Sequence, residues 1–442
     1  MMTTATSAIQ HYQTQYAQLA AQLPGADNIG LSALRSKAMK QVEQLGFPTR
    51  KHEDWKYTAI DSLLSQRFHS MQQLQLLEHA QILPFLLPDC CALLVFYNGL
   101  LQPTLTRIDP KVTGLTLLDL RTALNNPQLD VADRLSNQVI THGFTALNTA
   151  LMNDGYVLQV AANAQLLAPI QIIYLTEQAD LHTQYRNLIR LENFAEAVVV
   201  ETFVGAQTQA YFTNTVTQVE LADNAKLSHI KIQCESLSGY HVGTVFSKQQ
   251  RNSEFNSFSL AVGGALVRSD VETDLLGEGA KCDFNGLYIA SGKQHIDHHT
   301  RISHAIAHGS SREHYRGIIT GQAHAVFNGK VIVAEDAQKT NAEQSNKNLL
   351  LSPHAKIDTK PQLEIFADDV RCAHGATVGQ LDPQAIFYLQ SRGLTEANSR
   401  QLLIHAFADD SIEAIKHDPI RQQIRSLVNA KLTSFMETEY GL

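Results

Sequence analysis

Apolar and polar positions follow three different patterns along the chain, and each pattern predicts a different kind of structure. In HYQTQYAQLAAQL and LSALRSKAMKQVEQLGF, apolar residues recur every three or four positions, which predicts an N-terminal helical region over residues 1–88. Residues 89–118 have the pattern of short strands, and a helical insertion follows at about 119–151. Residues 383–442 return to a helical period and form a C-terminal helical region.

The strand-like pattern is longest between residues 156 and 380. Short apolar runs such as YVLQVAAN, PIQIIYL and AVVVETFV follow one another there without a helix between them. Separate β-α-β units are therefore excluded, because their parallel strands need helical connections. The triplet Phe284-Asn285-Gly286 recurs 43 residues later as Phe327-Asn328-Gly329. Similar corners recur at Asn163, Asn224, Gly279 and His354.

Recurring corners of small or amide residues are typical of a β-solenoid, in which each coil turns over the one below. Two coils of about 21 residues would account for the 43-residue spacing. A β-sandwich with coincidental corners is the alternative, but it favours two-residue hairpin turns, and few such turns occur here. The sequence thus predicts a mainly β protein, with a parallel β-helix core over residues 89–382 between two helical regions.

The composition argues against several classes of protein. Apolar residues make up 44% and charged residues 18% of the chain, a balance that fits an extensive stacked sheet. A net charge of −8 argues against nucleic-acid binding. No apolar run approaches the length of a membrane span, and the first residues lack the features of a signal peptide. We therefore expect a cytoplasmic protein with neither a nucleic-acid nor a membrane partner.

Five cysteines are present, and none forms a C-x-x-C pair. Their odd number argues against a disulfide framework, and their spacing argues against a self-contained cluster site. Cys372 has a distinctive setting because it stands two residues before His374, and residues i and i+2 of a strand face the same way. A thiolate beside an imidazole suits zinc, iron or copper(I). Because two ligands cannot close a four-coordinate site, another strand or subunit must contribute.

The histidine-rich stretch IASGKQHIDHHTRISHAIAHGSSREHYRG is a second candidate for metal binding. Its weaker metal candidates are His295, His298 and His299. On a strand, His295, Asp297 and His299 would share one face, while His298 would point to the other. A stacked ladder of polar side chains inside a solenoid is an equally consistent interpretation. No catalytic triad or phosphate-binding glycine loop stands out, so no catalytic residue is predicted.

Long contiguous motifs resemble those of a known family. The runs FNGKVIVAEDAQKTNAEQSNKNLLLS, AKIDTKPQLEIFADDVRCAHGATVGQLD, and FYLQSRGL with LLIHAFA look like the SufB/SufD family of iron–sulfur cluster assembly proteins. The similarity extends over residues 195–410. KHEDWKYT, at residues 51–58, resembles the SufD branch. It contains the only tryptophan, Trp55, which we expect to anchor this segment by packing on a neighbouring surface.

The resemblance implies a right-handed parallel β-helix and a scaffold rather than an enzyme. A SufD-like subunit would join a SufB-like paralogue and the SufC ATPase, assemble nascent iron–sulfur clusters and aid iron acquisition. SufC would dock on the C-terminal helices and supply ATP hydrolysis, since this chain has no Walker A sequence. The family motif places His374, and with it Cys372, at the interface with SufB, which contributes a cysteine to the iron or nascent cluster.

Several points stay open after the resemblance. The isolated chain is expected to form a homodimer through the same strand that would pair with SufB, namely the strand Leu363–Ala373. The part of any flavin is unknown, and Cys372 is the weaker of the two ligand candidates. Alternatives from other classes are an autonomous metalloenzyme built on the histidine run and a β-helix polysaccharide lyase.

Overall fold

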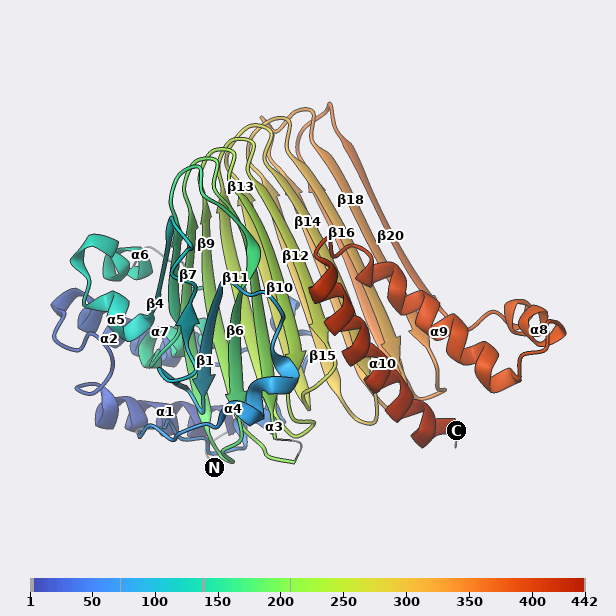
Figure 1. Cartoon of the computed structure of the whole chain (residues 1–442), viewed down its shortest axis with the longest axis horizontal. Coiled ribbons are helices and arrows are strands. Elements are labelled where there is room, and N and C mark those ends of the chain that lie inside the picture. The colour runs from blue at the N-terminus through green and yellow to red at the C-terminus, as the bar shows by residue number, and fades with distance from the viewer. Residues whose placement is uncertain (1–3, 72, 137–139, 207, 441–442) are drawn as a thin grey trace.

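A computed structural model describes residues 4–71, 73–136, 140–206 and 208–440 of the chain. It contains a parallel β-solenoid with helices towards both ends of the sequence (Figure 1). The mainly β, parallel β-helix fold expected from the sequence is therefore confirmed. Within the two terminal regions expected to be helical, residues 1–3 and 441–442 lie outside the described part of the chain.

Two sheets form the walls of the solenoid. The first sheet has the order β2-β1-β6-β8-β10-β12-β14-β16-β18-β20, with β3 beside β1, and the second sheet has the order β19-β17-β15-β13-β11-β9-β7-β5-β4. The strands of the first sheet are β1 (Ala92–Tyr97), β2 (Leu100–Leu101), β3 (Arg107–Ile108), β6 (Gln165–Thr176), β8 (Glu196–Gly205), β10 (Lys226–Cys234), β12 (Glu254–Ala261), β14 (Lys281–Ala290), β16 (Ser310–Ile319), β18 (Asn341–Leu350) and β20 (Arg371–Gly379). The strands of the second sheet are β4 (Leu115–Asp119), β5 (Tyr156–Val160), β7 (His182–Leu191), β9 (Phe212–Leu221), β11 (Tyr240–Gln249), β13 (Leu266–Leu275), β15 (His295–His304), β17 (His324–Val333) and β19 (Lys356–Ile365).

The coils are longer than the sequence pattern suggested. Lys226 pairs in parallel register with Glu254, and Glu254 with Lys281, so these neighbouring coils are 28 and 27 residues apart. Ser310 and Asn341 are register partners 31 residues apart. The expected coil of about 21 residues is therefore wrong. The 43 residues between the two Phe-Asn-Gly triplets span about one and a half coils instead.

The Phe-Asn-Gly triplets are not corners. Phe284 lies within β14 of the first sheet and Phe327 within β17 of the second, and both rings are buried in the solenoid core. Because side chains alternate along a strand, the glycine two residues after each phenylalanine also faces the interior. A Cβ at Gly329 would overlap the amide of Gln344, which reaches across the interior from β18. The triplet therefore marks interior positions where glycine makes room for a large neighbouring side chain.

Asn163, Asn224 and Gly279 form a column of turns between the second sheet and the first. Their φ angles of 63°, 61° and 72° are left-handed, a conformation that asparagine and glycine adopt most readily. The N–H of Asn224 donates to the carbonyl oxygen of Arg251 in the next coil. The expected corners are confirmed at these three positions and at His354, which lies in the opposite column of turns, between β18 and β19.

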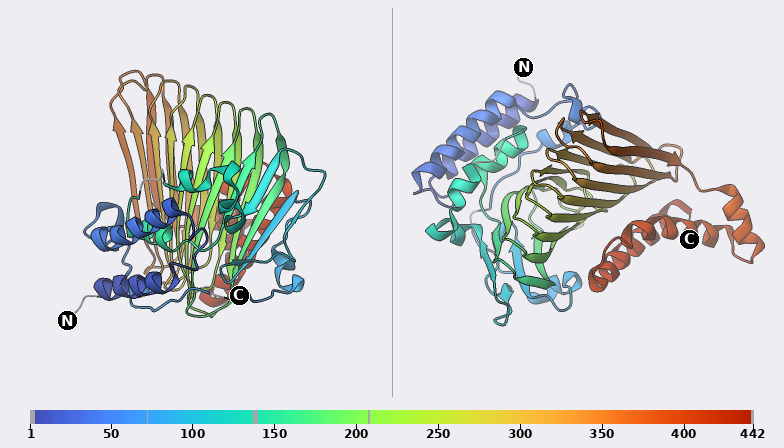
Figure 2. Two further views of the ribbon diagram at one scale, coloured as in Figure 1. Left: turned by 90° about the vertical axis from the view of Figure 1, so that its left-hand side faces the viewer. Right: turned by 90° about the horizontal axis from the view of Figure 1, so that it is seen from above.

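Helices cover the outer faces of both sheets (Figure 2). The apolar residues of α1 (Thr4–Leu19), α2 (Ile29–Leu45) and α7 (Gly143–Leu151) share a core with the second sheet. Those of α9 (Glu396–Ile412) and α10 (Asp418–Tyr440) pack on the first sheet. The other helices described are η1 (Glu53–Trp55), α3 (Asp61–Leu64), α4 (His79–Ile82), η2 (Leu83–Phe85), α5 (Leu120–Leu124), η3 (Pro127–Leu129), α6 (Val131–Ser136) and α8 (Pro383–Ser391). No helix in the described residues is long and apolar enough to cross a bilayer.

The two ends of the solenoid differ. At the N-terminal end, antiparallel pairing adds β2 and β3 to β1, and β4 to β5. At the C-terminal end, β19 and β20 each have one neighbouring strand among the described residues, and none of their own residues is buried. We call this last coil, residues 356–379, the open end. The stretch Leu363–Ala373, expected to be a single strand, instead comprises the end of β19, a connection and the start of β20.

Candidate functional site at the open end

Cys372 and His374 lie on β20, the outermost strand of the first sheet. Their register partners on β18 are Ala342 and Gln344, which are buried inside the solenoid. Since parallel register partners face the same side of a sheet, Cys372 and His374 both face the interior, as their spacing predicts. Cys372 is partly buried against the solenoid core. His374 is exposed, because the described chain adds no further coil above it.

This pair supplies two donors but not a closed metal site. Within the described ranges, no group of three or more histidine, cysteine or acidic side chains is placed to hold a metal ion. Burial raises the pKa of the Cys372 thiol, so the thiolate that ligates metals is disfavoured without a bound cation. His374 is the more exposed donor of the two. By itself, the arrangement therefore provides at most part of a metal site.

The solenoid interior carries charged side chains as well as apolar ones. Glu201 and His229 lie 2.7 Å apart, and Glu235 and His241 lie 2.6 Å apart, with all four side chains buried. Burial alone would raise the pKa of each glutamate, but its histidine partner lowers that pKa below the ordinary value. Burial also lowers the pKa of Lys231, which feels both carboxylates, to about 8. Each buried carboxylate thus has a histidine hydrogen-bond partner and lies near the cation of Lys231, so neither is isolated in the interior.

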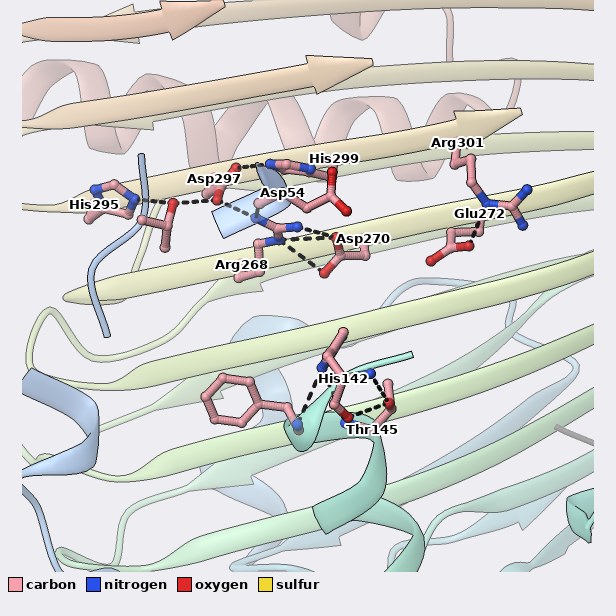
Figure 3. A network of polar contacts seen from close by, with 12 residues as sticks. Asp54, His142, Thr145, Arg268, Asp270, Glu272, His295, Asp297, His299 and Arg301 are labelled. Carbon is pink, nitrogen blue, oxygen red and sulfur yellow. Dashed lines mark hydrogen bonds and ion pairs between the residues drawn. The ribbon is translucent and has the colours of Figure 1, made fainter. Parts of the chain in front are cut away.

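The histidine run is divided between the two faces of β15. His298 faces the interior, where its ring stacks on Tyr288 with the centroids 5.2 Å apart. His295 and His299 face outward with Asp297 (Figure 3), which is the division that alternation along a strand predicts. The three candidate histidines therefore do not converge on one point. Burial lowers the pKa of His298 to about 3 and that of His295 to about 4, so both rings are neutral.

A network of polar contacts on the outer face of the second sheet holds residues 51–58, which we call the N-terminal segment (Figure 3). Arg268, on β13, is 2% exposed and donates to Asp270 at 2.7 Å and to Asp297 at 2.7 Å. It also donates to the carbonyl oxygen of Asp54, and its guanidinium lies 4.3 Å from the centroid of the Trp55 ring. Burial opposes ionisation of Asp297, but the charge of Arg268 brings its pKa well below the ordinary range. Trp55 thus anchors the segment on the solenoid, as the sequence predicts.

The same segment bridges several coils. The hydroxyl of Thr58 donates to Asp297 and lies 2.8 Å from the Nε2 atom of His295. Glu53 forms an ion pair with Lys360 on β19, so the segment reaches the open end. Between the segment, the start of α7 and the second sheet lies a cleft of about 390 Å³, lined in part by His299. Two of the weaker metal candidates, His295 and His299, therefore contact or adjoin the network that docks this segment.

Sequence reasoning missed the residues that organise these regions. Arg268 and Asp270 were not singled out. The stretch RSDVETD does alternate charged and uncharged residues, as a strand with one charged face does. Gln344 and Glu313, which lie in the coils below His374, were also missed. Their sequence separations of 30 and 31 residues become a signal only once the coil length is known.

The fold and the site define a class: a parallel β-solenoid with a cysteine and a histidine on the outermost strand of one sheet. Comparison with known proteins identifies the family. Residues 174–407 match the SUF system FeS cluster assembly SufBD core domain, and residues 6–85 match the SufBD protein N-terminal region. This chain belongs to the SufBD family of iron–sulfur cluster assembly proteins.

Individual relatives agree with this assignment. The chain is 31% identical over 398 residues to the iron–sulfur cluster assembly protein SufD of Escherichia coli, which covers 89% of this chain and 91% of the relative. A SufBD family protein of Synechocystis is 32% identical over 425 residues, with 93% of each chain covered. SufD of Bacillus subtilis is 30% identical, with coverage of 67% of this chain and 68% of the relative. The SufD-like character expected from the sequence is confirmed.

Proposed function

We propose that this chain is the SufD-like scaffold subunit of a cytoplasmic SufBCD-type complex and has no catalytic activity of its own. A SufB-like paralogue pairs with the open end, and an iron–sulfur cluster is assembled as cargo at the shared interface. SufC binds the C-terminal helices and supplies ATP hydrolysis, and the complex aids iron acquisition. The observation that carries the proposal is the position of His374, a ligand-type side chain exposed on an unpaired edge strand.

The open end has the properties of a surface that needs a partner. An edge strand presents unpaired N–H and C=O groups, which another strand can satisfy. Exposed apolar side chains gather there as well: Ile365 is 40%, Phe366 63% and Val378 49% exposed. Pairing would cover these residues and hydrogen-bond the edge at the same time. In the absence of the paralogue, a second copy of this chain can use the same edge in a two-fold symmetric dimer.

The ligand count also supports a shared site. A nascent cluster is held by thiolate or imidazole donors, and this chain supplies at most His374 and Cys372 at the edge. A cysteine from the paralogue would complete the donor set. His374 is the primary ligand in this proposal, because its side chain is exposed whereas the Cys372 thiol is partly buried with a raised pKa.

The position of α8 supports ATPase docking there rather than on all three C-terminal helices. Figure 2 shows α8 projecting beyond the body of the molecule. On α8, Phe387 is 72% and Tyr388 57% exposed, as expected for anchor residues of a protein interface. By contrast, α9 and α10 bury their apolar residues against the first sheet. Deleting residues 383–442 would uncover that sheet, so substitutions on α8 are the sounder test of SufC binding.

The test of the proposal is a substitution that blocks the free edge without disturbing the rest of β20. The N–H of Arg371 donates to the carbonyl oxygen of Thr340, so it points towards the neighbouring strand β18. Because N–H groups alternate in direction along a strand, the N–H of Ala376 points to the free edge. Ala376→Pro removes this donor, and Ala376→Ser is the matched control that keeps it.

We expect the Ala376→Pro chain to retain the circular dichroism of a folded solenoid. It should be a monomer by light scattering and should fail to co-purify with a co-expressed SufB-like paralogue. The Ala376→Ser chain should dimerise and co-purify normally. Unchanged dimerisation and paralogue binding by Ala376→Pro would contradict the proposed use of this edge.

A further inference from the structure

His374 stands above a short polar column inside the solenoid. Its register partner on β18 is Gln344, and the register partner of Gln344 on β16 is Glu313. Gln344 is 2% exposed and Glu313 is fully buried. The Nε2 atom of Gln344 donates to the Oε2 atom of Glu313 at 2.6 Å. The register therefore places a buried carboxyl group two coils below the exposed histidine of the open end.

The amide of Gln344 has one end without a partner. Its nitrogen is engaged by Glu313, whereas its Oε1 atom is buried and accepts no hydrogen bond within the described residues. A buried acceptor without a donor is costly, so a donor within its reach would be favourable. In the coil above, the residue in register is His374, and an imidazole ring carries an N–H. The position is built for this amide, since Gly329 on the opposite sheet makes room for it.

We infer that Gln344 is a positioning residue for His374: its Oε1 atom accepts a hydrogen bond from one ring N–H, and Glu313 holds the amide in that orientation. This inference rests on the proposed function of His374 as a ligand. Metal-ligating histidines commonly donate their other ring N–H to a carbonyl or carboxylate oxygen. Such a bond fixes the tautomer and leaves the lone pair of the second ring nitrogen free for the metal. The column would thereby direct that nitrogen towards the partner subunit.

The surroundings of Glu313 fit this role. Its Oε2 atom accepts from Gln344 of β18, and its buried Oε1 atom has no hydrogen-bond partner within the described residues. Cys282 of β14 and Tyr315 of β16 are titratable groups that feel its charge. Burial raises the pKa of Glu313 to about 7. The ionised carboxylate can only accept hydrogen bonds. At slightly alkaline pH it therefore keeps the nitrogen end of the Gln344 amide turned towards itself and the oxygen end available to His374.

The test measures the tautomer of His374 in the isolated full-length chain. The chain is deuterated and labelled with ¹⁵N-histidine, and the His374 signals are assigned by their absence in a His374→Gln variant. The imidazole ¹⁵N shifts then report which ring nitrogen carries the proton. Gln344→Leu removes the acceptor with little change in volume, and Gln344→Asn keeps an amide but shortens its reach by one methylene.

We expect one tautomer of His374 to predominate in the native chain. Gln344→Leu should shift the tautomer ratio by about fivefold, the value of one ordinary hydrogen bond. Gln344→Asn, whose shorter amide is a second and more conservative perturbation, should behave as Gln344→Leu does. A native tautomer ratio in both Gln344→Leu and Gln344→Asn would overturn the inference.

This measurement separates the inference from the function on which it rests. It needs neither iron nor a partner chain, so a column that fixes the tautomer is detected whether or not His374 binds a cluster. In complexes with the paralogue, Gln344→Leu should also speed the loss of iron to a chelator about tenfold, as removal of an outer hydrogen-bond partner typically does. If His374→Ala left iron retention unchanged, the proposed function would fail while the tautomer result would stand.

Discussion

Arg268 offers the sharpest test of how the N-terminal segment is attached to the solenoid. Its guanidinium is buried, pairs with two carboxylates and stacks on Trp55. Arg268→Ala leaves Asp270 and Asp297 as buried charges without their shared cation. Breaking a buried ion pair by removing one partner typically costs about 3–5 kcal/mol. The same substitution also removes the cation–π contact with the buried Trp55 ring, which is worth about 2 kcal/mol. The two energies are not summed, because one side chain makes both interactions and their costs are not independent.

Trp55 makes this cost measurable. It is the only tryptophan in the chain and is 3% exposed, so its fluorescence reports directly on docking of this segment. Urea unfolding is followed by tryptophan emission and, in parallel, by far-ultraviolet circular dichroism of the sheets. A loss of about 3 kcal/mol corresponds to a lower emission midpoint by about 1–3 M urea at usual slopes. The circular dichroism midpoint should move less, because the solenoid core does not contain Arg268.

Arg251→Ala is the matched control. The Arg251 side chain is 60% exposed and pairs with Asp223 at 3.3 Å on the surface, so its loss should change stability by no more than about 0.5 kcal/mol. The reasoning is refuted if Arg268→Ala leaves the emission midpoint as close to the native value as Arg251→Ala does. It is also refuted if emission and circular dichroism shift together by the same amount, because the network would then stabilise the whole solenoid rather than the segment.

Two further predictions concern the buried carboxyl group of Glu313 and the exposed aromatic side chains of α8. Glu313 has a folded-state pKa of about 7 against an ordinary value of 4.5, so its contribution to stability is present below pH 4.5 and is lost as the pH rises through about 7. Glu313→Gln should therefore gain about 2.5 kcal/mol relative to the native chain between about pH 5 and about pH 8. Glu343→Gln, at an exposed position of β18, is the control variant, and a flat difference for Glu313→Gln would contradict the burial argument. Replacing Phe387 and Tyr388 together by serine should weaken SufC binding at least about tenfold in a calorimetric titration. The control Phe194→Ser, at an exposed turn far along the chain, should bind SufC as the native chain does. Equal binding by both variants would exclude α8 as the docking site.

The sequence was a good guide to what depends on local pattern. Alternation along β15 correctly placed His298 on the opposite face from His295 and His299, because the direction of a side chain on a strand depends only on whether its position is odd or even. The same rule correctly placed Cys372 and His374 on one face. The helical period at both ends and the absence of crossover helices were sufficient to predict a solenoid between helices. These features need no knowledge of which distant residues meet.

What the sequence did not reveal depends on the coil length. The Phe-Asn-Gly repeat suggested a short coil, because its two copies fall on opposite sheets and are separated by a coil and a half. With the wrong coil length, Gln344 could not be placed beneath His374. The docking network was harder still, since Arg268 and Asp54 are 214 residues apart and meet only because a terminal segment folds back on the solenoid. Neither hydrophobic period nor charge pattern encodes such a contact directly.

The structure also changes the choice of control for the central experiment. His298→Ala, an obvious comparison from sequence alone, would remove a ring that packs on Tyr288 in the interior and would leave a cavity there. His354 is a better control because it is exposed on a turn beside the open end. His354→Ala removes a surface imidazole without disturbing the core.

The most direct test of the account is the iron and acid-labile sulfide content of the complex carrying His374→Ala. The variant is co-expressed with the SufB-like paralogue and SufC, and the intact complex is isolated and weighed by native mass spectrometry. We expect an intact complex with at least about tenfold less cluster, because one ligand of the shared site is missing. The His354→Ala complex should have native cluster content. Native cluster content in the His374→Ala complex would contradict the account, and so would a loss of cluster that only mirrors a loss of the complex.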